Sequence, residues 1–202
     1  EGIEMVVFGI TGGSGSGKTS VSKMLEKLGV HIIDTDVIAH EIVEPNSDCL
    51  NELVDYFGDS ILNDDKTLNR KKLASIAFSD KQKTEALSNI THKYIKAEVV
   101  KDINTTDAEL VGIDGAVIIG SNVEPLCKFI VSVIADKQSR IARIKTRDNI
   151  TDEQAIQRIN AQNDDEFYKE NSMYIIYNNG DIAQLESDVV GLFNKIKGNS
   201  FE

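Results

Sequence analysis

This chain of 202 residues holds few of the features that mark secreted, metal-stapled or membrane-spanning proteins. Its two cysteines, Cys49 and Cys127, lie far apart and outside any C-x-x-C or His-rich spacing, so neither a disulfide framework nor a zinc site is expected. No apolar run approaches the roughly 18 residues needed to cross a bilayer, and the N-terminus lacks the basic-then-apolar pattern of a secretory signal. We therefore expect a soluble, cytoplasmic protein with free thiols and no membrane contact.

Positive charge is also in short supply. The chain has 33 acidic and 22 basic residues, which gives a formal net charge of −11. Nucleic acids and anionic membranes attract basic surfaces, so this balance argues against nucleic acid as a partner. Internal repeats, low-complexity tracts and Pro/Gly-rich linkers are absent. The length fits one domain with an insertion or two small domains, as a monomer or a small homo-oligomer.

A glycine-rich loop follows the first apolar run, Met5–Thr11. Residues Gly12–Thr19 read Gly-Gly-Ser-Gly-Ser-Gly-Lys-Thr, the G-x-x-x-x-G-K-[ST] pattern of a phosphate-binding loop. A strand that ends in such a turn and continues into a helix directs several backbone N–H groups at one point, where the positive helix end also favours anions. A flexible Gly/Ser linker is the alternative, although a linker rarely stands between a strand and a helix.

The loop therefore predicts a nucleotide site in which Lys18 reaches the β/γ oxygens and the Thr19 hydroxyl binds Mg²⁺. The residues expected to contact ATP in this segment are Gly13, Ser14, Gly15, Ser16, Gly17, Lys18, Thr19 and Ser20.

Short apolar runs alternate with helical patterns along much of the chain. Their two-sided apolar character predicts an α/β fold with a doubly wound, mainly parallel five-stranded sheet. The expected strands are Met5–Thr11, Val30–Ile33, Leu110–Ile113, Phe129–Ala135 and Tyr174–Tyr177. The intervening helices should begin near Lys18, Arg140, Thr151 and Asp181, with a capping box at Thr151–Gln154.

Residues 36–105 break this alternation. The segment is mostly helical in pattern, with apolar residues such as Leu73, Ile76 and Ala77 at helical spacing. We interpret it as an inserted helical lobe, and residues 5–35 together with 106–200 as the nucleotide-binding core.

Two carboxylates, Asp34 and Asp36, close the second expected strand. Ligands of open α/β sheets bind beyond the carboxyl ends of the strands, so this strand can deliver carboxylates beside the phosphate loop. In phosphoryl transfer an aspartate accepts the proton of the attacking hydroxyl. A solvated turn or a helix N-cap is the alternative interpretation of the pair.

These motifs, taken in order, resemble the dephospho-CoA kinase family. The resemblance covers nearly the whole chain without obvious insertions. It rests on Gly9–Ser20, Leu28–Val30, Ile33–Glu41 with Glu44-Pro45, Leu68–Leu73, Ala77–Ser79, His92, Arg143-x-x-x-Arg147-Asp148, Arg158–Gln162 and Tyr177–Gly180. It implies a P-loop kinase of the nucleoside-monophosphate-kinase type that transfers the γ-phosphoryl of ATP to the ribose 3′-hydroxyl of dephospho-CoA, giving coenzyme A.

The resemblance also implies roles for individual residues. Thr11 and Asp36 match active-site positions, with Asp36 as the base, and Arg143 matches an arginine beside a helical lid at about 148–172. Asn178 resembles a position near the adenine. The acceptor would be bound by Asp34 and, in the lobe, by His40, Arg70 and His92, for which surface or capping roles are the alternative.

Three arginines, Arg140, Arg143 and Arg147, are spaced to share one helix stripe opposite Ile141 and Ile144. Such a stripe can clamp a triphosphate, with Arg143 neutralising developing charge and Arg147 binding ATP. For Arg140, whose counterpart in the family is often uncharged, we expect a solvated basic face.

The chain departs from the family pattern after its third strand. Where the family reads Asp-x-Pro-Leu-Leu-x-Glu, this chain keeps Asp114 but has Ala116 and Gly120. Asp114 can still hold Mg²⁺ through water. Lys93 also stands where the family usually has proline. We expect altered acceptor affinity and an unchanged fold.

Two other functions stay open at this point. One is a related P-loop kinase with another small hydroxyl or nucleotide acceptor, which the altered segment 114–120 allows. The other is an ATP-binding regulator without transferase activity, against which Lys18, Asp36 and Arg143 count.

Overall fold

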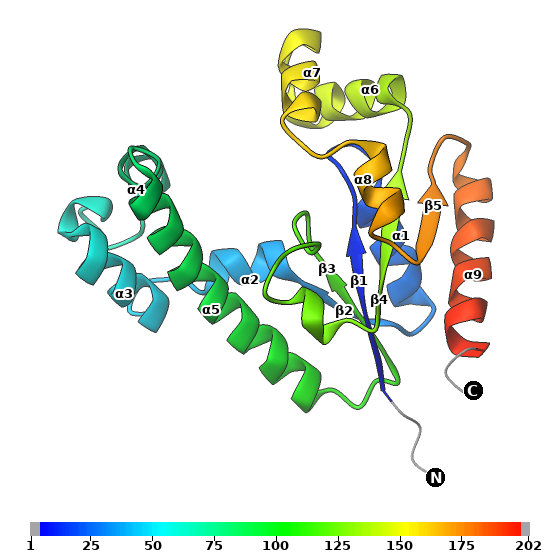
Figure 1. Ribbon diagram of the computed structural model, residues 1–202, viewed down its shortest axis with the longest axis horizontal. Helices are drawn as coiled ribbons and strands as arrows, with labels where there is room; N and C mark the ends of the chain where they lie inside the picture. The colour runs from blue at the N-terminus through cyan, green and yellow to red at the C-terminus, as the bar shows by residue number, and fades with distance from the viewer. Residues whose placement is uncertain (1–4, 199–202) are drawn as a thin grey trace. The chain divides into compact units, whose positions relative to one another are not determined.

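A computed structural model describes residues 5–198, so positions 199 and 200 of the expected core lie outside the described residues. Its centre is a five-stranded parallel sheet in the order β2-β3-β1-β4-β5 (Figure 1). The strands are β1 (Val6–Thr11), β2 (His31–Asp34), β3 (Leu110–Asp114), β4 (Phe129–Ile134) and β5 (Tyr174–Tyr177). The expected α/β fold and each expected strand are confirmed, with ends that differ by one residue at most.

The central strand β1 is buried along almost its whole length. Phe8 and Ile10 are fully buried, and β1 pairs with β3 on one side and β4 on the other. Phe8 stacks on Phe129 with ring centroids 5.3 Å apart, and Phe129 meets Tyr174 edge-on at 5.3 Å. These contacts join β1, β4 and β5 through side chains as well as through the backbone.

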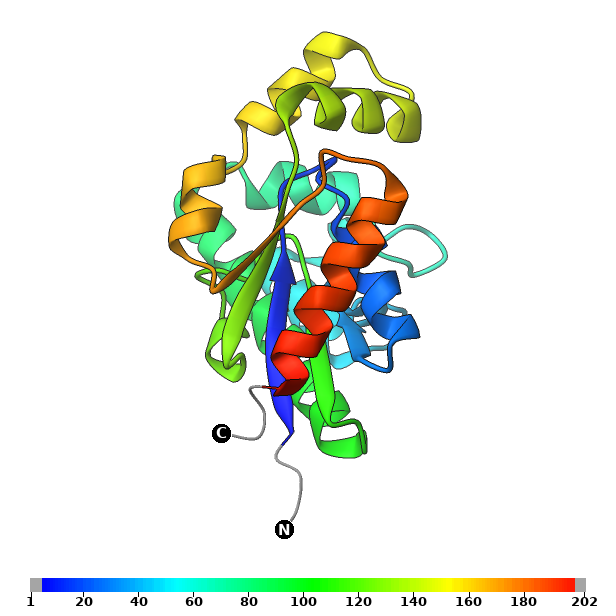
Figure 2. The ribbon, with the colours of Figure 1, turned by 90° about the vertical axis from the view of Figure 1, so that its right-hand side faces the viewer.

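Helices α1 and α9 complete this core. Helix α1 contacts α9, and Val21 and Leu25 of α1 lie in one buried cluster with Val189 and Leu192 of α9. Figure 2 shows α9 running along the sheet. The helices are α1 (Lys18–Lys27), α6 (Lys137–Asp148), α7 (Asp152–Asn160), α8 (Asp165–Glu170) and α9 (Ile182–Gly198), with a 3-10 turn η2 (Glu124–Leu126).

The starts of two helices test the sequence signals. Helix α7 begins after Thr151, whose hydroxyl accepts from Gln154 N while the Gln154 side chain accepts from Thr151 N, so the capping box is confirmed. Helix α6 begins at Lys137, three residues before the expected Arg140. The carboxylate of Asp136 accepts from Ser139 N and fixes this earlier start.

The segment after β2 is mostly helical, with one antiparallel β-bridge between Leu62 and Leu68. The long helix α5 contacts α2, α3 and α4, and Leu53, Ile61 and Val99 are fully buried in this unit. Its elements are α2 (Thr35–Glu41), α3 (Asp48–Phe57), η1 (Asp59–Ile61), α4 (Arg70–Ala77) and α5 (Lys81–Thr105).

Contacts divide the chain into two compact units. The first, here called the sheet unit, runs to Ile33 and resumes at Thr106, and the second, the helical unit, is Asp34–Thr105. Cys49 is buried in the helical unit and Cys127 is half-buried in the sheet unit, both as free thiols. Within residues 5–198, no helix is long and apolar enough to cross a membrane.

Candidate active site

The phosphate loop joins the end of β1 to the start of α1 and is folded tightly on itself. Ser16 N donates to Gly13 O over 3.1 Å, and Gly17, with φ +96°, forms the N-cap of α1. A Cβ at Gly17 would collide with the carboxamide nitrogen of Asn178. Gly17 is therefore required both by the left-handed backbone and by the close approach of the Asn178 side chain.

The carbonyl side of the loop is held by Arg143 of α6 and by Asn178, which follows β5. Arg143 Nη1 donates to Gly15 O and Ser16 O, and its Nη2 donates to Asn178 O over 3.0 Å. The buried Asn178 donates its Nδ2 to Ser16 O over 2.8 Å. Both side chains thus fix the backbone carbonyls on one side of the loop, which orients the N–H groups on the other.

Ser14 of the loop is bound by side chains of α6 and of the segment after α7. Its N–H donates to Gln162 Oε1 over 2.8 Å, its hydroxyl accepts from Gln162 Nε2 over 3.1 Å, and its carbonyl accepts from Arg140 Nε over 2.9 Å. Arg140 is only 5% exposed. None of these three hydrogen bonds was expected from the sequence.

The expected solvated face for Arg140 is therefore wrong. Arg140 and Ile144, one turn apart, share the buried face of α6, whereas Arg147 is exposed and Ile141 is partly buried. The arginine stripe is not a single solvent-exposed face. Its Arg140 and Arg143 pack against the phosphate loop, and only Arg147 is exposed.

Charged groups meet where the loop enters α1. Lys18 Nζ forms an ion pair with the buried carboxylate of Asp114 at the end of β3. Thr19 and Ser20 are exposed in the first turn of α1. Lys18 and the acid that closes the third strand are thus brought together, as parallel strands ending at one edge of a sheet allow.

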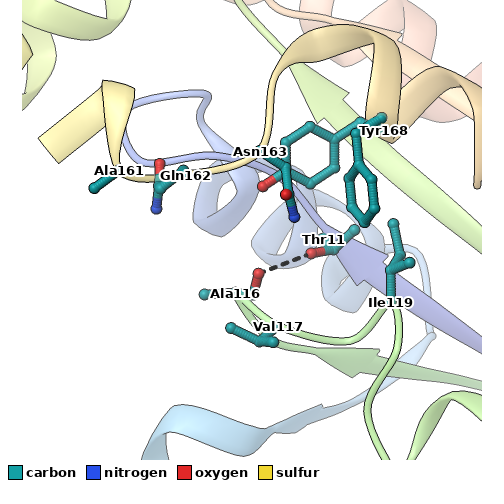
Figure 3. Close-up of a pocket in the computed structure, with 9 residues that line it drawn as sticks. Thr11, Ala116, Val117, Ile119, Ala161, Gln162, Asn163 and Tyr168 are labelled. Carbon is teal, nitrogen blue, oxygen red and sulfur yellow. Dashed lines mark hydrogen bonds between the residues drawn. The ribbon is translucent and has the colours of Figure 1, made fainter. Parts of the chain in front are cut away.

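A cavity of about 210 Å³ opens beside Thr11. Figure 3 shows Ala116 and Val117 on one side of it and Gln162, Asn163 and Tyr168 on the other. The buried Thr11 hydroxyl donates to Ala116 O over 3.3 Å. The cavity therefore joins the end of β1, the segment after β3 and the segment from α7 to α8.

The segment after β3 carries the two departures from the family pattern. Ala116 is exposed and presents its carbonyl to Thr11. Gly120 has φ +78°, with open space where a Cβ would lie, and its N–H donates to Glu124 Oε2 over 2.6 Å. A turn closed by Glu124 thus stands where the family usually has glutamate.

Arg147 forms a fork with its neighbour. Its Nε and Nη2 donate to the two carboxylate oxygens of Asp148 over 2.7 and 2.8 Å, and Arg158 of α7 donates to the same carboxylate. The Arg147 hydrogen bonds, helped by Arg158, lower the pKa of Asp148 to about 2. This ion pair joins α6 to α7, and it engages the guanidinium that the sequence analysis assigned to ATP.

The helical unit holds the remaining candidate residues. Asp34 is the N-cap of α2, since its carboxylate accepts from Asp36 N over 2.9 Å and from Val37 N over 3.1 Å, while Asp36 lies exposed in the first helical turn. Of the interpretations offered for Asp34, the helix N-cap is the one that its hydrogen bonds match.

A largely apolar pocket of about 300 Å³ lies in the helical unit, and Arg70 and His92 are among its lining residues. Arg70 Nη2 lies 2.8 Å from His40 Nδ1. Two of the four expected acceptor residues therefore line this pocket, and His40 contacts one of them. Its apolar lining includes Ile42, Leu53, Leu73, Leu87 and Ile95.

Comparisons with known proteins agree with this geometry. The model of the family described as dephospho-CoA kinase matches residues 6–184. The dephospho-CoA kinase of Lactobacillus johnsonii is 34% identical over 192 residues, covering 94% of this chain and 97% of that protein. The Listeria monocytogenes strain EGD-e enzyme of the same name is 34% identical over 195 residues, covering 95% and 98%.

A solved structure gives the same result. The dephospho-CoA kinase from Campylobacter jejuni superposes with a TM-score of 0.68 at 27% identity, covering 96% of this chain and 98% of that one. The superposition therefore covers nearly the whole of both chains. The chain belongs to the dephospho-CoA kinase family.

Proposed function

We propose that this protein transfers the γ-phosphoryl group of ATP to the ribose 3′-hydroxyl of dephospho-CoA, giving coenzyme A and ADP in the cytoplasm. The observation that carries the proposal is the match of nearly the whole chain to relatives bearing that enzyme's name. The phosphate loop supplies a place for ATP, and the pocket of the helical unit supplies a place for an acceptor with an apolar arm.

In this proposal the loop amides and Lys18 bind the phosphates. Amides at the N-terminus of α1 and the nearby ammonium favour a polyanion. Arg143 and Asn178 support this binding from the carbonyl side, because their hydrogen bonds keep the loop in one conformation. Arg143 would also neutralise charge in the transition state if the loop shifts on binding, and Arg147 would do so only after releasing Asp148.

Mg²⁺ would be held by oxygen donors of this site. The Thr19 hydroxyl and the Asp114 carboxylate are hard oxygen ligands of the kind that Mg²⁺ prefers. Within residues 5–198 no group of three or more His, Cys, Asp and Glu side chains could hold a metal ion, which fits an ion bound mainly through substrate phosphates. When bound, the ion neutralises phosphate charge.

Asp36 is the proposed base. Its exposed carboxylate in the first turn of α2 can accept the proton of the attacking hydroxyl and align it with the γ-phosphate. Thr11, at the end of β1 and in the wall of the cavity, would position the reacting groups. Water must be kept from the γ-phosphate, and we assign this to the segment at about 148–172.

The acceptor would lie in the helical unit. Arg70, paired with His40, offers a fork for a phosphate, and His92 adds a second polar group at the same pocket. The apolar lining fits the pantetheine arm. Asp34 would act through the start of α2, which its carboxylate caps and which carries Asp36.

A coupled assay of ADP release tests this function. We expect release that requires ATP, Mg²⁺ and dephospho-CoA, and none above background with nucleoside monophosphates or shikimate. Mass spectrometry should identify coenzyme A as the product. ADP release with another acceptor, or ATP binding with no acceptor-dependent release, would refute the proposal. Lys18→Ala serves as the inactive control.

A further inference from the structure

Gln162 lies two residues past the end of α7 and is bound to the phosphate loop through both ends of its carboxamide. Its oxygen accepts from Ser14 N over 2.8 Å and from Arg140 Nη2 over 3.3 Å. Its nitrogen donates to the Ser14 hydroxyl over 3.1 Å. One oxygen of Gln162 therefore receives a backbone N–H of the loop and a guanidinium N–H together.

The guanidinium is built into this place. Arg140 is 5% exposed, donates its Nε to Ser14 O over 2.9 Å, and has Asp165 of α8 at 3.8 Å from its Nη1. Gly13 has no room for a side chain, because a Cβ there would collide with Arg140 Nη2. A buried cation thus lies against the loop at Ser14, bound to the Ser14 carbonyl and to the same Gln162 oxygen that accepts from Ser14 N.

A loop amide and an arginine converging on one oxygen form the donor set that phosphate groups receive in proteins. A neutral carboxamide oxygen accepts both hydrogen bonds, but an anionic phosphate oxygen accepts them more strongly, because the bond from the backbone N–H becomes charge-assisted and the bond from the guanidinium becomes an ion pair. Arg143 is not available in this way, since its Nη atoms donate to three backbone carbonyls.

We propose that the Gln162 carboxamide takes the place of a nucleotide phosphate oxygen at Ser14, and that Arg140 binds that phosphate once the nucleotide displaces Gln162. The proposal rests on the use of the Gly12–Thr19 loop for ATP phosphates. Gln162 competes with ATP, whereas Arg140 contributes to ATP affinity. Displacement also releases the segment between α7 and α8 from the loop, so phosphate binding frees the wall of the cavity beside Thr11.

The test is calorimetric titration of the full chain with MgATP. Gln162→Ala should bind about three- to tenfold more tightly than the unmodified protein, because the bound state no longer has to displace an internal acceptor. Arg140→Lys should bind roughly tenfold more weakly, since it keeps the charge but loses the planar fork. Gln157→Ala, which removes an exposed glutamine of α7, is the matched control and should leave the affinity unchanged.

Each departure from this pattern is decisive. Weaker binding by Gln162→Ala would make the carboxamide a ligand of the nucleotide, and equal binding would remove the competition; either result overturns the proposal. Unchanged binding by Arg140→Lys, confirmed with Arg140→Gln, would remove Arg140 from the phosphate site. Dephospho-CoA-dependent formation of ADP from ATP in the same samples tests the function separately, because its failure with the affinity pattern intact refutes only the proposed reaction.

Discussion

Gly13 leaves no space for a side chain between the phosphate loop and Arg140. We expect Gly13→Ala to lower the free energy of unfolding by about 1–3 kcal/mol, because the added methyl forces a buried arginine out of its hydrogen bonds. Urea denaturation measures this change.

Gly191 in α9 provides the matched control for that substitution. A Cβ at Gly191 meets open space, and alanine favours the helical backbone, so Gly191→Ala should raise the free energy of unfolding by about 0.5–1 kcal/mol. Equal stability of the two variants would contradict the proposed packing of Arg140 on the loop.

Asp36 is the residue whose loss should separate chemistry from binding. We expect Asp36→Asn to lower kcat by about 10²- to 10⁴-fold, because the hydroxyl loses its proton acceptor, while the Kd for ATP stays the same. Steady-state kinetics with dephospho-CoA and a direct ATP titration measure the two effects.

Asp55→Asn, an exposed aspartate of α3 in the same unit, controls for the change in charge. Turnover of Asp36→Asn equal to that of this control would remove Asp36 from the mechanism.

Helices α6 and α7 are joined by Asp148, which accepts from Arg147 and Arg158. The pKa of Asp148 falls from 3.8 to about 2, so its ionised form favours the folded protein. The stabilisation is complete above the unfolded value of 3.8 and is lost as the pH falls towards the folded value of about 2.

Hydrogen exchange over residues 137–160 provides the measurement for this pair of helices. Asp148→Asn should exchange faster than the unmodified protein at pH 6, and the difference should shrink as the pH falls below about 4. A difference that does not depend on pH would show that Asp148 acts without its charge. Asp55→Asn, which removes the charge of an exposed aspartate of α3, is the control for the loss of one negative charge.

The elements that local signals determine were predicted well from the sequence. The strands are short apolar runs, and Thr151 and Gln154 form their cap without help from distant residues. The start of α6 was predicted three residues late because Asp136 was not recognised as its cap. Helical spacing also grouped Arg140 with the exposed Arg147, and this grouping was wrong. Periodicity alone does not reveal that the Arg140 side of the helix packs against a loop more than a hundred residues earlier in the chain.

The candidate site was predicted in the same uneven way. The motif located the loop and Lys18, and the end of the third expected strand located Asp114, which the fold brings to Lys18. The contacts of Gln162 and Arg140 with Ser14 were missed, since each depends on how α6 and α7 pack on the loop. His40, Arg70 and His92 came from the resemblance. The pocket that Arg70 and His92 line, and the contact of His40 with Arg70, depend on packing among the helices α2, α4 and α5.

At the scale of the whole molecule, each unit carries one thiol. Burial is the largest cause that raises the pKa of Cys49 to about 11 and of Cys127 to about 12. At pH 8 both thiols should therefore be protonated and slow to react with iodoacetamide while the protein is folded. Mass spectrometry after labelling should find each cysteine modified only when its own unit unfolds.

The variants Cys49→Ser and Cys127→Ser show which labelled peptide in the mass spectrum comes from which unit. Rapid labelling of either thiol in the native protein at pH 8 would contradict the burial described for it.

The helical unit is one uninterrupted segment of chain, entered at Asp34 and left at Thr105. Asp36 lies on that segment together with Arg70 and His92, whereas Lys18 and the phosphate loop lie outside it. The proposed base and the proposed acceptor pocket therefore lie on one continuous segment of chain, which a single stretch of the gene encodes. Exchange of this segment between kinases of the same fold would change the specificity for the acceptor hydroxyl in one recombination event and leave ATP binding unchanged.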